Sequence, residues 1–121
     1  MALTPQARET FTRLFGVEPQ PHPTDPELFD ILQNGIFDEA FSTGVLTAVE
    51  RELIGLVAIA AIGATTQLRP HVAGAIRAGS SRQKVAAALV QVMPYIGGPY
   101  ALSGLVLVAR YDESASAEAY R

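Results

Sequence analysis

The chain has 121 residues, no cysteine and a formal net charge of −3. A chain of this length fits one domain that folds without disulfides, and the lack of thiols excludes cysteine nucleophiles, zinc-thiolate sites and iron–sulfur clusters. The acidic balance gives no basic surface of the kind that binds nucleic acid.

The first 24 residues predict a helix followed by an extended linker. Thr4 is a helix cap and Pro5 fits the first helical position, where its missing N–H costs nothing. Gly16 ends this helix, and the next ten residues, VEPQPHPTDP, carry four prolines and predict a linker. The apolar residues of the helix repeat at helical spacing and are Ala7, Phe11, Leu14 and Phe15.

A second helix is predicted to begin at Asp25-Pro26 by the same capping logic and to end at Ser42-Thr43-Gly44. Its apolar residues form one stripe, which we expect to face the core. They are Leu28, Phe29, Leu32, Ile36 and Phe37.

The third predicted helix is the most apolar part of the chain. Thr47 and Glu50 form a capping box, and the helix that they open is apolar on nearly every side through Ile62, which predicts a central position. The run from Leu53 to Gly63 is shorter than the ~20 residues needed to cross a bilayer. With no signal-peptide pattern at the N-terminus, we expect no membrane association and a cytoplasmic location.

Three more helices complete the prediction. The fourth begins near Thr66, because Pro70 is tolerated only in a first turn, and runs to Ala78. Ser80 to Gln83 reads as a second capping box for the fifth helix, which Pro94 should end. The sixth covers residues 100–110, and a polar tail covers 112–121. Residues 1–121 are therefore expected to form one all-α domain of about six helices, without strands.

Glu52 and His71 are the candidate catalytic residues. Glu52 is followed along its helix face by small and apolar residues, so it is either an ion-pair partner, a solvent-reaching residue or a buried group with a raised pKa. His71 lies near a helix N-terminus, which favours the neutral imidazole. Gly74, one turn later, leaves space that a ligand or a close helix crossing would use. A purely structural polar pair is the alternative for both residues.

Other polar residues have weaker functional interpretations. Arg69 and Arg77 could hold a carboxylate, or they could be surface charges. His22 in the linker is expected to be solvated. The segment from Tyr95 to Pro99 is a tight turn between helices, where Gly97 and Gly98 permit backbone angles closed to other residues.

Four motifs together resemble the carboxymuconolactone decarboxylase family, which is related to alkylhydroperoxidase D. They are RELI at residues 51–54, QLxxH at 67–71, the small-residue helix ending at Ala78-Gly79, and YxGxP at 95–99. The peroxidase branch has a Glu, a CxxC and a His, which match Glu52, Ala64, Gln67 and His71 here. Because both thiols are absent, the resemblance is to the cysteine-free branch, and thiol peroxidase activity is excluded.

The resemblance implies an all-helical AhpD-like fold, assembled as a homo-oligomer, a trimer or hexamer, and a low charged fraction of 17% agrees with that. It also implies a lyase of aromatic-compound catabolism that removes CO2 from a small carboxylated lactone without cofactor or metal. His71 would then be the acid–base group, and Glu52 would orient it or share its proton. Gln67 or Arg69 would stabilise the oxyanion, while Tyr95 and Gly98 would border the substrate.

Two departures from the family pattern keep other functions open. Gln83-Lys84 stands where an acidic residue is usual, and Gly98 replaces a large residue before Pro99. One alternative is an isomerase or cyclase of a natural-product or aromatic-degradation pathway, which uses the same Glu and His. Another is a non-catalytic helical oligomer in which the two residues form a structural pair.

Overall fold

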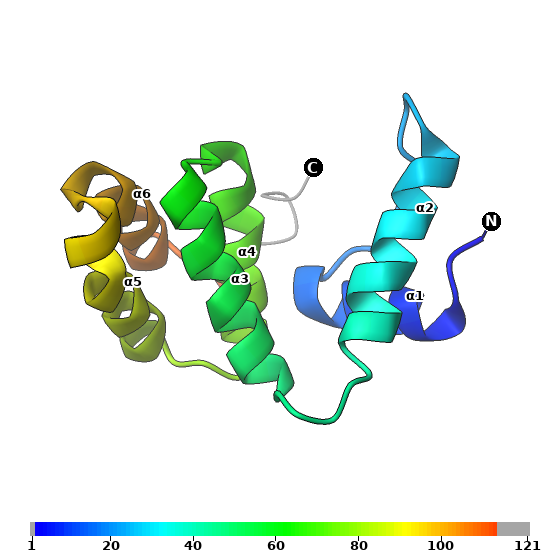
Figure 1. Cartoon of the computed structure of the whole chain (residues 1–121), viewed down its shortest axis with the longest axis horizontal. Helices are drawn as coiled ribbons and strands as arrows, with labels where there is room; N and C mark the ends of the chain where they lie inside the picture. Colours follow the sequence, from blue (N-terminus) through cyan, green and yellow to red (C-terminus); the bar gives the residue numbers. More distant parts are fainter. Residues whose placement is uncertain (1, 114–121) are drawn as a thin grey trace.

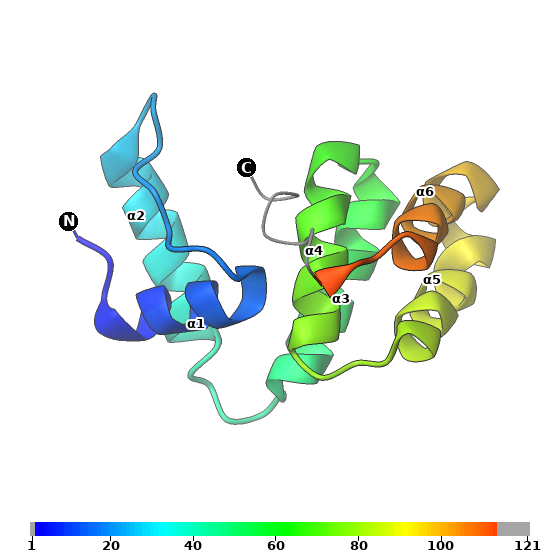
Figure 2. The same cartoon turned by 180° about the vertical axis from the view of Figure 1, so that it is seen from behind.

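The structure is a computed structural model that describes residues 2–113, and within that range it is helical with no strand. This confirms the predicted all-α fold with six α-helices. Figures 1 and 2 show two groups of helices, with α1 and α2 on one side and α3 to α6 on the other. In chain order the elements are α1 (Pro5–Phe15), α2 (Pro26–Asn34), the π-helical segment η1 (Gly35–Ala40), α3 (Ala48–Ile62), α4 (Thr65–Arg77), α5 (Arg82–Ile96) and α6 (Gly98–Ala109).

Three predicted helix starts are confirmed by their caps. The hydroxyl of Thr4 accepts a hydrogen bond from the amide of Ala7, and the carboxylate of Asp25 accepts one from the amide of Leu28. Thr47 and Glu50 form the complete capping box at the start of α3. Each cap satisfies amides that the first helical turn would otherwise leave unpaired.

The predicted start of α5 was wrong by one residue, and two prolines were given too much weight. Ser81 caps α5 by accepting from the amide of Lys84, while Ser80 is buried before the helix. Pro94 lies inside α5, and Pro70 lies in the second turn of α4. A helical proline leaves the carbonyl four residues earlier without its partner. Those carbonyls belong to Thr66 and Val90, which are exposed, so solvent can hydrate them.

Helices α3 to α6 enclose the larger of two hydrophobic cores, which we call the bundle core. Leu89 of α5 is fully buried in it and packs against Gly104 of α6, where a Cβ atom would lie 2.8 Å from its Cδ1. That glycine lets α5 and α6 approach closely. The buried residues of the bundle core are Leu56, Ala60, Leu68, Val72, Ala75, Val85, Leu89 and Val108.

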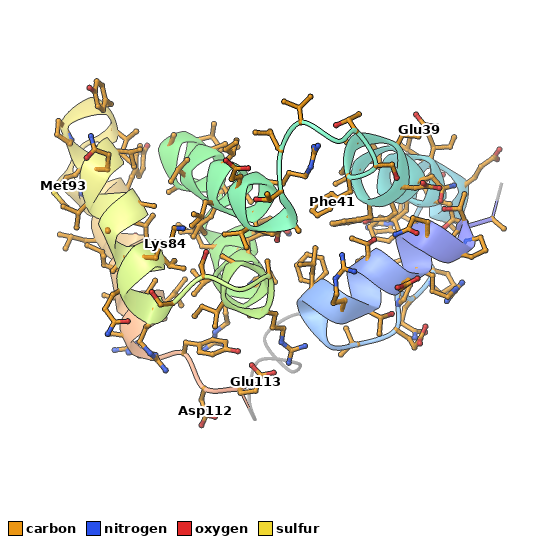
Figure 3. The ribbon with its side chains drawn as sticks, turned by 90° about the horizontal axis from the view of Figure 1, so that it is seen from below. Glu39, Phe41, Lys84, Met93, Asp112 and Glu113 are labelled. Carbon is orange, nitrogen blue, oxygen red and sulfur yellow. The ribbon has the colours of Figure 1, made fainter. Side chains whose placement is uncertain are left out.

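The N-terminal region, residues 2–41, has an aromatic core of its own. Phe11, Phe15 and Phe37 form a triangle of edge-to-face rings with centroids 4.9 to 5.7 Å apart. Phe41 extends this cluster towards α3, where the guanidinium of Arg51 lies over its ring (Figure 3). Helix α1 also packs directly on α4. The aromatic core therefore sits against the helix that carries His71.

Side-chain hydrogen bonds join the two ends of the N-terminal region. The buried side chain of Asn34 accepts from the amide of Thr4 at 2.8 Å and donates to the carbonyl of Ala2 at 3.0 Å. Asp38 accepts from the hydroxyl of Thr4 at 2.6 Å. These bonds fix the start of α1 against α2 and η1.

The predicted burial of the α2 stripe was wrong for most of its residues. Phe37 is buried, but Leu28, Leu32 and Ile36 are each about half exposed. Helix α2 contacts the rest of the chain through η1 and its Gln33–Asn34 side, so no other element among residues 2–113 covers the stripe. The expected central position of α3 is likewise only partly right, because Ile54 and Ile62 are exposed. No helix among residues 2–113 is long and apolar enough to span a membrane.

Candidate functional site

Glu52 lies in the second turn of α3 and is only 5% exposed. Its Oε1 has no hydrogen-bond partner, and no ion pair involves its carboxyl group within the described residues. Neighbouring Arg51 is engaged elsewhere, by bonds to Leu46 and Thr43. Both simple alternatives for Glu52, a partnered arginine and a solvent-reaching carboxylate, were therefore wrong.

Burial is what sets the protonation of Glu52. Loss of hydration disfavours the charged carboxylate, and this raises the pKa of Glu52 from 4.5 to about 7. Because no cation in the described part of the chain lies close enough to offset that loss, the carboxyl holds its proton through most of the acidic range. At neutral pH it is poised to release or take up one proton.

Gly74 of α4 provides the space that the Glu52 carboxyl occupies. A Cβ atom at position 74 would lie 2.7 Å from Oε1 of Glu52, closer than side-chain atoms pack. It would also lie 3.3 Å from Cε1 of Phe15. The space predicted beside Gly74 is thus filled by the carboxyl group and by the edge of an aromatic ring.

His71 lies one turn before Gly74 on α4 and is partly buried. Its ring meets the ring of Phe15 edge-on, with centroids 5.4 Å apart. The ring of Phe15 therefore lies against His71 and also beside Gly74, which the Glu52 carboxyl contacts. The described residues include no hydrogen bond or ion pair between Glu52 and His71, so direct contact of the two groups is not seen here.

Desolvation lowers the pKa of His71 below 6.5, so the imidazole is neutral at pH 7. The pKa of Glu52 moves in the opposite direction for the same reason. Near neutral pH the site therefore holds an uncharged imidazole and a carboxyl group that is close to half protonated. Such a pair can exchange a proton with a bound molecule without carrying a large net charge.

A cavity of about 960 Å³ opens beside the start of α4. The linker after α1 supplies part of its lining, and Thr66, Gln67 and Pro70 of α4 supply another part. Glu52 and His71 are not among the described residues that line it, although His71 follows Pro70 directly. The lining residues are Phe11, Gly16, Val17, Glu18, Gln20, Pro21, His22, Pro23, Phe29, Thr66, Gln67 and Pro70.

The other predicted binding residues are dispersed. Gln67 lines the cavity, whereas Arg69 is exposed and outside its lining. Tyr95 is 82% exposed, and Gly98 lies with it at the junction of α5 and α6, away from the cavity. The structure therefore brings Gln67 near His71 but does not bring Arg69, Tyr95 or Gly98 into the same cavity.

Arg77 has a structural position in place of the carboxylate-binding role considered above. Its guanidinium packs against Gly16 at the end of α1, and it forms an ion pair of 2.8 Å with Glu113. Figure 3 shows Glu113 beside the end of α4. The predicted tail at 112–121 is described only through residue 113, so the rest of it lies outside the described residues.

Sequence reasoning missed every lining residue except Gln67, and His22 is the missed residue with an ionisable ring. It is exposed, as predicted for a loop residue, but it also lines the cavity. Its Nδ1 accepts hydrogen bonds from the amides of Thr24 and Asp25, and its ring lies 5.4 Å from that of Phe29. The position of His22 three residues before a helix cap was the only local signal for this arrangement. Within residues 2–113 no group of three or more His, Asp or Glu residues could hold a metal ion.

A model of the carboxymuconolactone decarboxylase family matches residues 26–110. The chain belongs to the carboxymuconolactone decarboxylase family. The match covers α2 to α6, including Glu52, Gln67 and His71, and it begins after α1 and the linker. No curated protein matches the chain significantly. The sequence has no cysteine, so it supplies no thiolate at the positions of the CxxC motif.

Proposed function

We propose that this chain is a cofactor-free acid–base enzyme in which Glu52 and His71 transfer one proton. The observation that carries the proposal is the buried Glu52 carboxyl, which lies against Gly74 with no partner for Oε1. Burying an unsatisfied polar group is costly, so a purely structural role gives it no compensating interaction. Buried carboxyls with raised pKa values are typical of proton donors and acceptors in active sites.

The first candidate reaction is the loss of CO2 from a small carboxylated butenolide lactone. The bond between the ring carbon and the carboxylate breaks, and its electron pair moves into the conjugated lactone carbonyl, which gives a dienolate. One proton is then added to carbon as the dienolate collapses. The enzyme recovers that proton from solvent, so the reaction needs no oxidant, metal or cofactor.

The two residues have different parts in this proposal. His71 is neutral at pH 7 because burial lowers its pKa, so its imidazole does not carry the second proton at that pH. Glu52 still carries a proton there, since its pKa is about 7. We therefore assign Glu52 as the proton store and His71 as the group that passes the proton to the substrate. Gln67 can donate a hydrogen bond to the dienolate oxygen.

A second candidate reaction is isomerisation or cyclisation without CO2 loss, using the same two residues. The observation that favours it is the position of Arg69, which is exposed and outside the cavity lining. A substrate carboxylate in the cavity would then lack the cation that commonly binds such groups. An uncharged substrate needs no such cation, and its isomerisation still requires proton transfer.

Turnover by matched variants tests the proposal. General acid–base groups contribute about 10²–10⁴-fold to rate, so Glu52→Gln and His71→Gln should each lower kcat by that range. Glu39→Gln, a control on the exposed surface of η1, should leave it unchanged. CO2 release and isomer formation are measured on a carboxylated lactone and on its uncarboxylated analogue. Full activity of Glu52→Gln with either substrate would overturn the proposal.

A further inference from the structure

The cavity beside α4 has two walls of different origin. Thr66, Gln67 and Pro70 belong to the part of the chain that matches the family, as does Phe29 of α2. The remaining lining residues belong to α1 and the linker, outside the matched range. This chain therefore closes the cavity with a segment that precedes its family-matched part.

We propose that this cavity is the binding site for the ring system of an uncharged small molecule, larger than a single lactone ring, with oxygen atoms that accept hydrogen bonds. The inference rests on the proposed acid–base function, because His71 lies directly after Pro70 at the cavity wall. It names the class of substrate for the second candidate reaction, isomerisation or cyclisation, in which the substrate carries no carboxylate.

The size and the apolar walls of the cavity support a ring system. Small-molecule sites typically enclose roughly 300–1,000 Å³, and the 960 Å³ here lies at the upper end of that range. A single five-membered lactone would leave most of this volume to water. Rings and rigid apolar groups that suit such a ligand form half of the lining: Phe11, Val17, Pro21, Pro23, Phe29 and Pro70.

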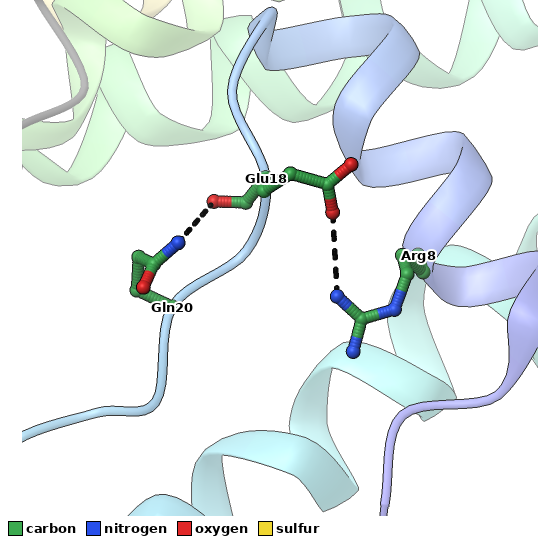
Figure 4. Close-up of polar contacts among 3 residues, drawn as sticks. All are labelled: Arg8, Glu18 and Gln20. Carbon is green, nitrogen blue, oxygen red and sulfur yellow. Dashed lines mark hydrogen bonds and ion pairs between the residues drawn. The ribbon is translucent and has the colours of Figure 1, made fainter.

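The charges around the cavity favour a neutral ligand. Glu18 is the one carboxylate in the described lining, and neither lysine nor arginine is part of it. The carboxylate of Glu18 is already paired, at 3.3 Å, with Arg8 of α1, as Figure 4 shows. A carboxylate ligand would lose water without gaining a free cation, whereas a neutral ligand avoids that cost.

The polar side chains in the lining are suited to ligand oxygens. Nδ1 of His22 accepts two backbone hydrogen bonds, so the neutral ring carries its hydrogen on Nε2 and can donate from there. Gln67 of α4 offers an amide donor, and Thr66 offers a hydroxyl. Gln20, at the linker rim, donates to the carbonyl of Glu18 in Figure 4. Donors on both walls can therefore hold one ring system between them.

Two probes of matched shape and different charge test the inference: 2-naphthol, which is neutral at pH 7, and 2-naphthoate. Binding to the full chain is measured by titration calorimetry. We expect 2-naphthol to bind with a Kd about tenfold lower than that of 2-naphthoate, because the cavity offers no free cation. Phe29→Ala should weaken binding of both probes. Equal or tighter binding of 2-naphthoate, or no binding of either probe, would overturn the inference.

A pair of arginine substitutions on the linker locates the binding. Gln20→Arg adds a cation to the lining and should raise the affinity for 2-naphthoate while leaving 2-naphthol nearly unchanged. Thr24→Arg makes the same change on the linker outside the lining, so it should alter neither affinity. An equal gain from both substitutions would show non-specific attraction and contradict the assigned place.

The binding test is independent of the acid–base chemistry. Glu52 does not line the cavity, so Glu52→Gln should bind 2-naphthol like the unmodified chain. Loss of probe binding alongside turnover of a carboxylated lactone would remove this inference and leave the proposed function. Retained probe binding with full activity of Glu52→Gln would remove the proposed function and leave the cavity as a binding site for neutral ring systems.

Discussion

The two regions of this molecule are each stabilised internally by different kinds of interaction. The bundle of α3 to α6 packs by close approach of small residues, as at Gly104 against Leu89 and Gly74 against Glu52. The N-terminal region packs by an aromatic triangle and by the hydrogen bonds of Asn34 and Asp38. The candidate proton-transfer residues lie in the bundle, whereas most of the cavity lining comes from the N-terminal region.

In our proposals, the bundle carries the residues that transfer a proton, and the N-terminal region carries most of the residues that bind the ligand. Glu52 and His71 lie inside the family-matched range, and their burial depends on contacts within the bundle and with Phe15. The linker residues of the cavity lining lie outside that range and include two prolines and the imidazole of His22. We infer that changes in the bundle should alter proton transfer, and that changes in the linker should alter which molecule binds.

The largest effect is expected from Gly74→Ala. The new Cβ would lie 2.7 Å from Oε1 of Glu52 and must displace the carboxyl group, so turnover should fall by about 10²-fold or more. Gly55→Ala is the matched control on α3, because nothing lies within 4 Å of its Cβ position. That control should keep its activity and gain about 0.5–1 kcal/mol of stability from helix propensity. Equal activity of the two variants would contradict the role of the Gly74 contact.

The next largest effect concerns the stability of the fold against pH. The pKa of Glu52 is 4.5 unfolded and about 7 folded, so the folded state binds the extra proton between those values. Its contribution is therefore complete below pH 4.5 and decreases as pH rises to 7, by about 3 kcal/mol in the free energy of unfolding.

Denaturant unfolding from pH 4.5 to 8 measures this effect. Glu52→Gln should remove the decrease, and Glu39→Gln should retain it. In Glu52→Gln the free energy of unfolding should instead increase as the pH rises towards 6.5. The lowered pKa of His71 causes this, because the unfolded state binds more protons than the folded state in that range. An unchanged slope in Glu52→Gln would show that another group causes the pH dependence.

A smaller effect is expected on assembly. Leu28, Leu32 and Ile36 of the N-terminal region are about half exposed, and we predict that a second copy of the chain covers them in a trimer or larger oligomer. Leu32→Glu should weaken that assembly by about 2 kcal/mol per contact, the cost of losing an interface anchor. Light scattering at micromolar concentration measures it, with Glu39→Gln as control. A monomer in the unmodified chain would contradict the prediction.

The smallest effect is expected from Asn34→Ala. Loss of its bonds to Ala2 and Thr4 should cost about 1 kcal/mol, because water can reach both partners. Hydrogen exchange should accelerate in α1 and stay unchanged in α6. Gln91→Ala, on the exposed face of α5, should change neither helix. Faster exchange throughout the chain would mean that the two regions unfold as one unit.

Local chemistry explains which parts of the fold could be predicted from the sequence. Thr4, Asp25 and Thr47 were assigned correctly because a cap depends on only a few neighbouring residues. Ser80 and Ser81 present nearly the same local pattern, and only the backbone decides between them. The exposure of Leu28 and Leu32 could not be predicted, because an apolar stripe does not show whether the chain itself supplies a neighbour.

The candidate site was predictable only in part, for the same reason. The carboxylate of Glu52 on an apolar helix face indicated a candidate buried acid, and Gly74, one turn after His71, indicated free space beside α4. The contact of Glu52 with Gly74 requires the crossing of α3 and α4, which no short motif encodes. The cavity depends on a linker folded against α4, and neither the helix cap after His22 nor the apolar pattern around Phe29 encodes that packing.

The central claim is that Glu52 is a buried proton store, and its titration tests this most directly. The Cδ chemical shift of Glu52 is followed by ¹³C NMR from pH 3 to 9, with the resonance assigned by its loss in Glu52→Gln. We expect a midpoint near 7, because desolvation raises the pKa and no cation among residues 2–113 lowers it. A midpoint near 4.5, the value of a hydrated glutamate, would contradict it.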